Sequence, residues 1–502
     1  MLTFRNIIGM ALLLSGVAVL FAFESLGSIF LFLSPDGQVS PFMWLLLKIF
    51  LISLGVVGAL MLMFPRLLRF AARIDRWIVT TNSRRLLWRA LAIAFLLRLL
   101  AVAVMPFHLW GDYQCYDDLG RQWADSGAYS IGGHLTAYWP PGYPFWLSRL
   151  YLMFGHEPLA GVLANVLLGT ATVLLSYLLI RRLWGERIGR WTLLVMAVFP
   201  SQVLFTNVLA SEMLFTPLFL AAILFFVIGS RTERWWLPVM TGGVILGLAT
   251  LTRTVTALLL IPITLYWLAE KKNWSGAGFR LVLALTGFLL VTTPWMVRNY
   301  HAVGKVCLST NSGVNLFIGN QPGSGMGYNQ QAVEQLDLSD PTQEARVDGQ
   351  AARQAWDYIA ERPMAFVSRG VAKTAYLFAT DIDPLDFVLQ PAGDNRSRAG
   401  WVVLAVVTQS YYVTVLLLAI VALPIILRSK IHRRGPTTLV LSTLGYWTVL
   451  HFVFFAVGRF HFPLVPLLAA LAVVALAYRI DMVSWGTSAH PKQFLDKRNQ
   501  EN

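Results

Sequence analysis

The sequence predicts an all-α polytopic membrane protein with about twelve transmembrane helices and two large loops on one side of the membrane. Three observations predict this fold. Hydrophobic residues make up 56% of the 502 residues and charged residues only 13%. The apolar residues recur in runs of about twenty along the whole chain, the length that crosses a bilayer. Basic residues crowd every second connection between these runs, which is the pattern of cytoplasmic loops.

The apolar runs predict the helices in chain order. The first run follows only Arg5 and lacks a small-residue cleavage site, so we expect a retained anchor helix rather than a cleaved signal. The expected spans lie near residues 6–23, 42–64, 87–106, 158–180, 190–208, 212–229, 236–251, 254–269, 280–297, 401–427, 437–457 and 462–480.

The basic residues predict the orientation. Arginines crowd the 66–89 connection, and every second connection after it is basic as well. The positive-inside rule then places both termini in the cytoplasm, with the chain in the plasma (inner) membrane and the two large loops on the outer, periplasmic side. The net charge of +14 is therefore an orientation signal and not a nucleic-acid footprint, so no nucleic-acid partner is expected.

The first large loop, residues 107–157, opens with the acidic segment "GDYQCYDD". Helical spacing predicts a helix over 112–126. "YWPPGYPFWLSRLYLMFG" then predicts a proline-led aromatic helix, ending near Gly155, that lies in the membrane interface.

The second large loop, residues 298–400, has three predicted parts. "STNSGVNLFIGNQPGSGMGYN" is turn-rich and predicts irregular structure. "TQEARVDGQAARQAWDYIAERP" predicts a helix of soluble character, and "MAFVSRGVAKTAYLF" predicts a helix along the membrane surface. Each large loop holds one cysteine, Cys115 or Cys307; free thiols are favoured and a disulfide between the loops stays open.

Seven segments, in order, resemble a known family: "GDYQ-Y-DD", "YWPPGYPFWLSRLYLMFG", "LASEMLFTPLFL", "GLATLTRTVTALLLIP", "TPWMVRNYHAVGK", "NSGVNLFIGN" and "GRFHFPLVPLLAALA". Together they resemble the glycosyltransferases of the C superfamily (GT-C). The branch they resemble most is that of the protein-O-mannosyltransferases and aminoarabinose transferases, which use polyprenyl-phosphate sugars. The likeness covers roughly residues 87–480, so the two preceding helices fall outside it.

This resemblance implies a GT-C-like fold and a division into four parts. Two N-terminal helices with a basic cytoplasmic loop occupy residues 1–86. A transmembrane transferase module with the catalytic first outer loop occupies 87–297. The large outer loop at 298–400 follows, and 401–502 form the C-terminal helices and cytoplasmic tail.

The resemblance also implies that the first outer loop supplies a catalytic carboxylate, here Asp112. A transfer of sugar from a lipid phosphate to a hydroxyl needs a base at the acceptor oxygen, whereas the departing phosphate needs no acid. The alternative is that Asp112 only caps the helix after it. Many family members have Asp-Glu where this chain has Asp112-Tyr113, so the second acid is absent. Asp117 and Asp118 could substitute for it or bind a divalent cation, or they form a solvated face.

Glu212, at the start of a span, is predicted to orient the acceptor or the sugar; helix capping and pairing with the helix dipole are its alternative. Cationic side chains at the outer ends of spans are candidates for the lipid phosphate, since guanidinium fits phosphate oxygens, although each could be a membrane anchor. Aromatic residues of the first loop are predicted to guide the lipid or acceptor. The candidate substrate contacts are Asp117, Asp118, Tyr138, Tyr143, Arg253, Arg298, Lys305, Arg459 and His461.

Two further sets of charges stand out. Arg98 lies within a predicted span, where we expect it to meet an acid from the first loop. Asp381, Asp383 and Asp386 could line an acceptor site, but a solvated loop is the favoured interpretation.

The predicted function is an inverting membrane glycosyltransferase with a lipid-phosphate sugar as donor. The acceptor is an envelope lipid, lipid-linked glycan, polysaccharide or protein. No glycine-rich nucleotide motif and no His/Cys metal spacing is apparent, so no cofactor is assigned; a divalent cation and the oligomeric state are left open. The alternatives are a transporter or lipid flippase and a noncatalytic scaffold, and a transporter would place its polar groups deeper in broken spans.

Overall fold

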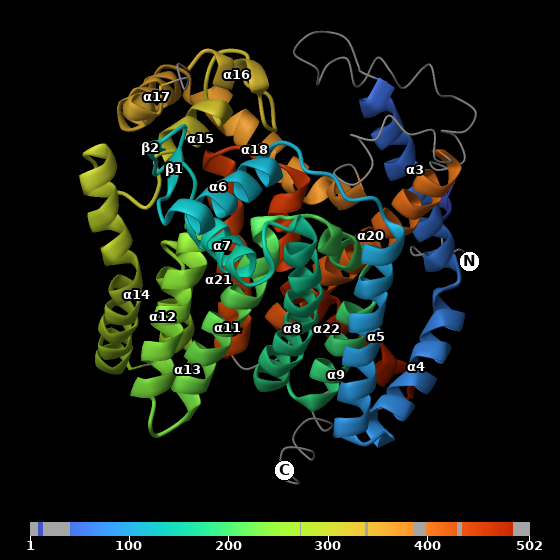
Figure 1. The fold of residues 1–502 in the computed structure, drawn as a ribbon. Helices are drawn as coiled ribbons and strands as arrows, with labels where there is room; N and C mark the ends of the chain where they lie inside the picture. Colours follow the sequence, from blue (N-terminus) through green and yellow to red (C-terminus); the bar gives the residue numbers. More distant parts are fainter. Residues whose placement is uncertain are drawn as a thin grey trace.

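The computed structural model describes residues 9–13, 41–271, 273–336, 340–385, 398–428 and 434–484 (Figure 1). The regular secondary structure of these residues is helical apart from one short antiparallel hairpin, β1 (Ser130–Ile131) with β2 (His134–Leu135). The expected first span at 6–23 falls mostly outside the described residues, and so does Asp386.

The helices follow one another in this order: α3 (Pro41–Leu62), α4 (Phe64–Thr80), α5 (Ser83–Val104), α6 (Asp112–Ser126), α7 (Gly142–Phe154), α8 (Pro158–Trp184), α9 (Glu186–Ala197), α10 (Pro200–Leu204), η1 (Phe205–Asn207), α11 (Ser211–Arg231), α12 (Trp236–Thr252), η2 (Thr254–Thr256), α13 (Leu260–Lys271), α14 (Trp274–Val303), α15 (Ser312–Gly319), α16 (Gln330–Glu334), η3 (Pro341–Gln343), α17 (Glu344–Glu361), α18 (Pro363–Ala379), α20 (Arg398–Arg428), α21 (Arg434–Val453), η5 (Gly458–Leu464) and α22 (Val465–Ser484).

The chain is a multi-pass membrane protein, but the count of twelve spans is not confirmed. Among the described residues, six helices are long and apolar enough to cross a membrane, or eight if two bent pairs each form one span. Segments 236–252 and 254–270 are apolar but shorter. The six are Ser83–Val104, Pro158–Trp184, Ser211–Arg231, Trp274–Val303, Gly400–Leu427 and Gly458–Met482.

Proline accounts for both bends. The helix ending at Leu62 turns by 74° into α4, whose first turn contains Pro65, and α9 turns by 55° into α10, which begins at Pro200. A proline ring clashes with the preceding turn and lacks the N–H that would continue the helix, so an apolar run can be longer than the straight helix it forms.

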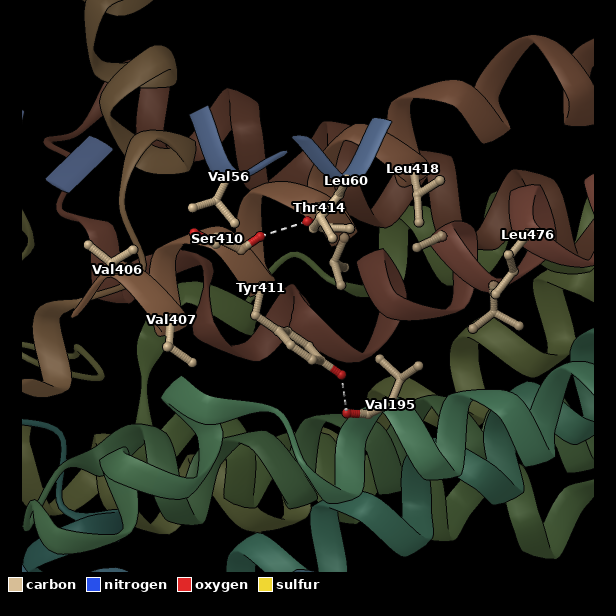
Figure 2. Close-up of a pocket in the computed structure, with 13 residues that line it drawn as sticks. Val56, Leu60, Val195, Val406, Val407, Ser410, Tyr411, Thr414, Leu418 and Leu476 are labelled. Carbon is tan, nitrogen blue, oxygen red and sulfur yellow. Dashed lines mark hydrogen bonds between the residues drawn. The ribbon is translucent and has the colours of Figure 1, made fainter. Parts of the chain in front are cut away.

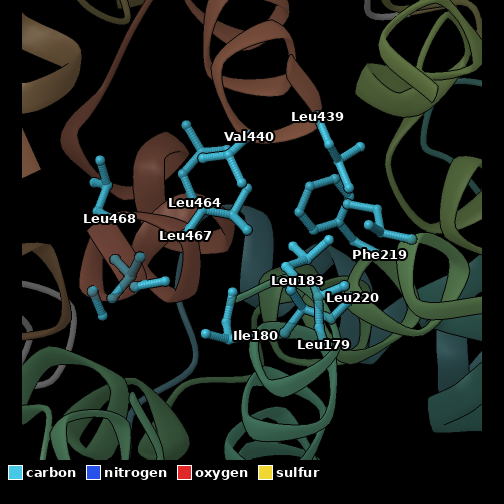
Figure 3. Packing of buried hydrophobic residues seen from close by; sticks show 14 of the residues in the cluster. Leu179, Ile180, Leu183, Phe219, Leu220, Leu439, Val440, Leu464, Leu467 and Leu468 are labelled. Atoms are coloured by element: carbon cyan, nitrogen blue, oxygen red, sulfur yellow. The ribbon is translucent and has the colours of Figure 1, made fainter. Parts of the chain in front are cut away.

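The centre of the bundle is a large apolar cluster in which helices far apart in the sequence meet (Figure 3). Leu179 and Leu183 of α8 and Phe219 of α11 are buried there with Leu439 of α21 and Leu467 of α22. Apolar packing of this kind brings the last helices of the chain against the first half of the bundle.

The two large loops lie at the same end of the helices, shown at the top of Figure 1, whereas the α13–α14 connection lies at the opposite end. The expected helices at 112–126, at 142–154 and at 344–361 are confirmed as α6, α7 and α17. The expected irregular segment after Ser309 is in part wrong, because Ser312–Gly319 forms α15. Four of these eight residues, Val314, Leu316, Phe317 and Ile318, are apolar, and they pack on α17.

An apolar cavity of about 500 Å³ lies between α3, α9, α20 and α22 (Figure 2). Val195, Val407 and Leu476 are among its lining residues, and Tyr411 reaches across it to donate a hydrogen bond to the carbonyl of Val195 (3.0 Å). None of the candidate site residues lines this cavity.

A charged network fastens the N-terminal α4 to the rest of the bundle. Arg187 of α9 makes paired hydrogen bonds to Asp75 of α4 (2.7 and 2.9 Å) and to Asp481 of α22 (2.9 and 3.0 Å). Trp191 also donates to Asp75, which is buried. A bidentate arginine between two carboxylates is well matched in geometry and charge.

Arg187→Ala should therefore destabilise the protein by about 2 kcal/mol, because it leaves the buried Asp75 carboxylate without its cation. The expected result is a thermal midpoint several degrees below that of the parent protein in the same detergent, at constant scan rate. Arg84→Ala, an exposed arginine on α5, is the control and should leave the midpoint unchanged. Equal midpoints for Arg187→Ala and the parent protein would contradict the role given to this network.

Candidate active site

Four charged side chains from distant parts of the sequence meet at the end of the bundle that carries the large loops. The carboxylate of Asp112 lies 2.5 Å from Nη2 of Arg459. The carboxylate of Glu212 lies 3.9 Å from Nε of Arg459 and 2.6 Å from Nη1 of Arg253. The result is a chain of alternating charges, Asp112–Arg459–Glu212–Arg253.

Asp112 owes its place to the turn before it. Gly111 has φ of +57°, a conformation that favours glycine, and α6 begins at the next residue. The residue before the helix makes no side-chain capping bond, and the Asp112 carboxylate turns to Arg459. The helix-capping alternative for Asp112 is therefore not what the structure contains. The side chain keeps 34% of its surface exposed, which leaves room for a substrate.

Arg459 is held through its backbone as well as its side chain. Its N–H donates to Oδ2 of Asp383 at 2.6 Å. A Cβ on the preceding residue, Gly458, would lie 2.7 Å from Asp383 and 2.8 Å from the carbonyl oxygen of Thr380, so the close approach of these segments requires glycine there.

The sequence favoured a solvated loop for Asp381, Asp383 and Asp386. For the two described acids, Asp381 and Asp383, this interpretation is wrong. Asp383 receives the Arg459 N–H, and burial raises the pKa of its carboxyl, an effect that this bond partly opposes. Asp381 is buried and lies 3.2 Å from Nε2 of His461. Both acids support the segment that carries Arg459.

Glu212 is almost fully enclosed in the first turn of α11, with 1% of its side chain exposed. Arg253 also donates to the hydroxyl of Ser211 (3.2 Å), and that hydroxyl donates to Glu212 (3.3 Å). A buried carboxylate requires such compensation, and Arg253 supplies the charge. Ala210 precedes α11 and no side-chain capping bond is present, but Glu212 lies in the first turn, so the dipole-pairing part of its alternative stays open.

Aromatic rings border the two guanidinium groups. Phe460 lies under both, with ring centres 5.2 Å from the Arg253 guanidinium and 5.8 Å from that of Arg459. Tyr113 accepts a hydrogen bond from Nη1 of Arg459 (2.6 Å). Burial raises the pKa of the Tyr113 phenol, and the charge of Arg459 opposes this in part, so the hydroxyl stays protonated.

Asp117 and Asp118 do not join this cluster. Asp117 faces α7 and its C-terminal turn, where it accepts hydrogen bonds from the Tyr151 hydroxyl and His156. It is buried, so the solvated-face interpretation is wrong for Asp117, whereas Asp118 is exposed as that interpretation expected.

Two of the predicted phosphate ligands instead join the large loops. Nη1 of Arg298 donates to the carbonyl of Thr136 (2.5 Å) and Nη2 to that of Tyr129 (2.6 Å). Lys305 pairs with Asp348 of α17 at 2.8 Å. Both cations are thus engaged by protein groups, and the structure gives neither of them a place in the Arg459 cluster.

The same region holds a contact that the sequence did not reveal. Glu344, at the start of α17, accepts hydrogen bonds from the hydroxyl of Thr136 and the N–H of Ala137, both at 2.6 Å. Its carboxylate is buried and ties the second loop to the first. In the sequence, Glu344 is an acid at the start of a polar helix, and nothing near it indicates a partner more than two hundred residues away.

Three remaining candidates have different environments. His461 is enclosed, with its ring nitrogens at the Leu377 carbonyl (2.7 Å) and at Asp381, so it is not placed to meet a substrate. Tyr143 is also fully buried, 5.5 Å from the ring of Tyr116. Tyr138 is only partly buried and packs in the same cluster as Phe460, so it stays a candidate.

The prediction for Arg98 is wrong. It is fully buried in α5, and Nη1 donates to the carbonyl of Ala94 (3.0 Å), whereas Nε and Nη2 have no hydrogen-bond partner among the described residues. Gly169 of α8 makes room for its side chain, since a Cβ there would lie 2.5 Å from Nε. No acid of the first loop reaches it.

The acids of the first loop do not form one metal-binding set. Asp112 is paired with Arg459, Asp117 with α7, and Asp118 points to solvent. Across the part of the chain that the structure describes, no group of three or more His, Cys, Asp or Glu side chains is placed to hold a metal ion. Cys115 and Cys307 are free thiols.

The family comparison supports part of the sequence interpretation. Residues 139–297 match the family model described as dolichyl-phosphate-mannose-protein mannosyltransferase. The resemblance predicted from the sequence is confirmed over this segment, which contains Glu212 and Arg253 and lies between Asp112 and Arg459. No curated protein matches the chain.

Two solved structures are similar to this chain at low identity. The archaeal oligosaccharyltransferase AglB from Archaeoglobus fulgidus, in complex with an inhibitory peptide and a dolichol-phosphate, is 13% identical over 82% of this chain and 52% of its own, with a TM-score of 0.47. ArnT from Cupriavidus metallidurans, bound to undecaprenyl phosphate, is 16% identical over 80% of each chain, with a TM-score of 0.39. This chain therefore spans about half the length of the archaeal protein.

Glu344→Ala should loosen the tie between the two large loops. The loss of two hydrogen bonds to a buried carboxylate should cost about 2 kcal/mol locally. We expect faster cleavage of the 130–137 hairpin by a protease at concentrations that leave the parent protein intact. Glu361→Ala, an exposed acid at the other end of α17, should cleave at the parent rate. An unchanged cleavage rate in Glu344→Ala would contradict the role of Glu344 in holding the two loops together.

Proposed function

We propose that this protein is a membrane glycosyltransferase that moves a sugar from a polyprenyl-phosphate donor to a hydroxyl of a cell-envelope acceptor. The observation that carries the proposal is the convergence of a partly exposed carboxylate and two guanidinium groups at the ends of the helices. The match of residues 139–297 to the mannosyltransferase family model supports the same reaction class.

The proposed reaction is a single displacement with inversion. The acceptor oxygen attacks the anomeric carbon while the bond from that carbon to the phosphate oxygen breaks, and the phosphate keeps the electron pair. The Asp112 carboxylate takes the hydroxyl proton. The phosphodiester of the donor carries one negative charge and the departing monoester carries two, so cations at the phosphate favour the transition state over the bound donor.

Arg459 and Arg253 are the proposed phosphate ligands. Arg253 lies at the C-terminal end of α12 and Arg459 in the short η5, and both are partly accessible, with 19% and 16% of their side chains exposed. Oε1 of Glu212 lies near both, at 2.6 Å from Nη1 of Arg253 and 3.9 Å from Nε of Arg459. Tyr138 is proposed to contact the acceptor or the lipid beside Phe460.

We place this site on the outer, periplasmic face, on the strength of the basic connections at the opposite ends of the helices. The rival functions are a transporter or flippase and a scaffold. A transporter binds its cargo near the middle of the membrane, whereas the four charges occupy a C-terminal helix cap, two first turns and a short 3-10 helix. A noncatalytic scaffold would not need a mostly buried cluster of four charges in which one acid, Asp112, is partly exposed.

Asp112→Asn should lower turnover by about a hundredfold or more, because the amide cannot take a proton from the acceptor. The assay uses the purified full chain, a labelled polyprenyl-phosphate mannose and membrane extract, and measures acceptor-dependent release of polyprenyl phosphate. Asp125→Asn, an exposed acid on the same helix, is the matched control and should keep full activity. Full activity in Asp112→Asn, with normal folding, would remove the base from the mechanism. Transport of intact donor across vesicles without cleavage would favour the flippase instead.

Arg253→Gln should raise the KM for the donor by about tenfold, because one of two phosphate cations is lost. It should also lower stability, since Glu212 would be left buried without its partner. The steady-state KM is therefore measured at a temperature where the variant is folded by its thermal midpoint. Arg346→Gln, an exposed arginine of α17, should leave KM unchanged. An unchanged donor KM in Arg253→Gln would assign this arginine to stability alone.

A further inference from the structure

In the charged cluster, the proposed base Asp112 and the donor phosphate have the same proposed partner, Arg459. The group that the proposed mechanism needs for the phosphate, Nη2 of Arg459, is occupied by the proposed base, Asp112, at 2.5 Å. An anionic phosphate at this position and the Asp112 carboxylate are competitors for the same N–H groups. Two anions sharing one guanidinium edge repel each other, so one has to yield.

We propose that Arg459 is a shared counterion that passes from Asp112 to the donor phosphate when the donor binds. This inference rests on the proposed function, and it adds an order of events to it. In the free protein the Asp112 carboxylate is paired with Nη2 of Arg459. Donor binding displaces Asp112 from Arg459 and leaves it an unpaired carboxylate beside the acceptor.

The other contacts of Arg459 allow this exchange without movement of the guanidinium. Tyr113 accepts from Nη1 at 2.6 Å, Asp383 accepts from the backbone N–H, and Glu212 lies on the Nε side at 3.9 Å. These three partners are independent of Nη2. Asp112 is the more exposed of the two acids, with 34% of its side chain exposed against 1% for Glu212. Water can therefore hydrate its carboxylate when it leaves Arg459.

Charge is balanced throughout the proposed reaction. As the bond from the sugar to the phosphate breaks, the phosphate gains one negative charge. As Asp112 takes the acceptor proton, its side chain loses one. The neutral acid no longer competes for Arg459, so the whole guanidinium charge is available to the monoester at the moment when its negative charge is greatest.

A double-mutant cycle on ligand binding tests the exchange. The probe is undecaprenyl phosphate added to the purified full chain in nanodiscs of neutral phosphatidylcholine, with uncharged undecaprenol as the control ligand. Asp112→Asn should bind undecaprenyl phosphate about threefold to tenfold more tightly than the parent protein, because the competing anion is gone. Asp125→Asn, which removes the same charge elsewhere on α6, should bind with the parent affinity.

The decisive comparison is made without Arg459. Arg459→Gln should bind undecaprenyl phosphate at least tenfold more weakly. In the double variant Asp112→Asn/Arg459→Gln, the gain from removing Asp112 should disappear, because the two effects act through the same guanidinium. Affinity for undecaprenol should be the same in all four proteins.

Two results would overturn the exchange while leaving the proposed function in place. In the first, Asp112→Asn binds no more tightly than the parent protein although Arg459→Gln binds more weakly. In the second, the gain from Asp112→Asn persists without Arg459, which would assign it to general repulsion. A third result, in which the parent protein binds undecaprenyl phosphate no better than undecaprenol, would overturn both the exchange and the proposed donor.

Discussion

The guanidinium of Arg459 is the interaction on which the rest of the site depends. It is a mostly enclosed cation, and its burial is tolerable only because Asp112, Glu212 and Tyr113 surround it. These partners come from α6 and α11, whereas Arg459 lies in η5, the short 3-10 helix that leads into α22. A single charged side chain thus fixes how the first loop, the middle of the bundle and the C-terminal helices meet.

The position of the site at helix ends follows from the same constraint. Charged side chains are costly in the hydrocarbon of the membrane and inexpensive where helices reach the interface. Glu212 lies in the first turn of α11, and Arg253 caps the end of α12. Rigid helices therefore hold the inner pair of charges, whereas Asp112 stands on a loop helix with partial exposure. This arrangement combines a buried Glu212–Arg253 pair with a more exposed acid, Asp112.

The sequence was a good guide to which residue types gather here and a poor guide to their partners. Asp112, Glu212, Arg253 and Arg459 were predictable because each is a charge next to the end of an apolar run. Arg298 and His461 carry the same signal and are engaged by carbonyls and Asp381 instead. Pairing depends on side-chain directions in the folded bundle, which no local pattern encodes.

The count of twelve spans is left unconfirmed for a related reason. Apolar length predicts burial in the membrane, but it does not say whether a helix stays straight. Pro200 bends the span predicted at 190–208, and the helices at 236–252 and 254–270 are shorter than a straight span. Helices such as α6 and α7 were found because their polar and apolar faces alternate at helical spacing, a local property that tertiary packing did not override.

Tyr113 was missed as a partner of Arg459 because a tyrosine beside an acid has no charge to signal it. Its neutrality has a consequence for the cluster. A second acid at this position would set three carboxylates against two guanidinium groups, whereas Tyr113 keeps the numbers equal. The phenol accepts from Nη1 of Arg459 without adding negative charge to the cluster.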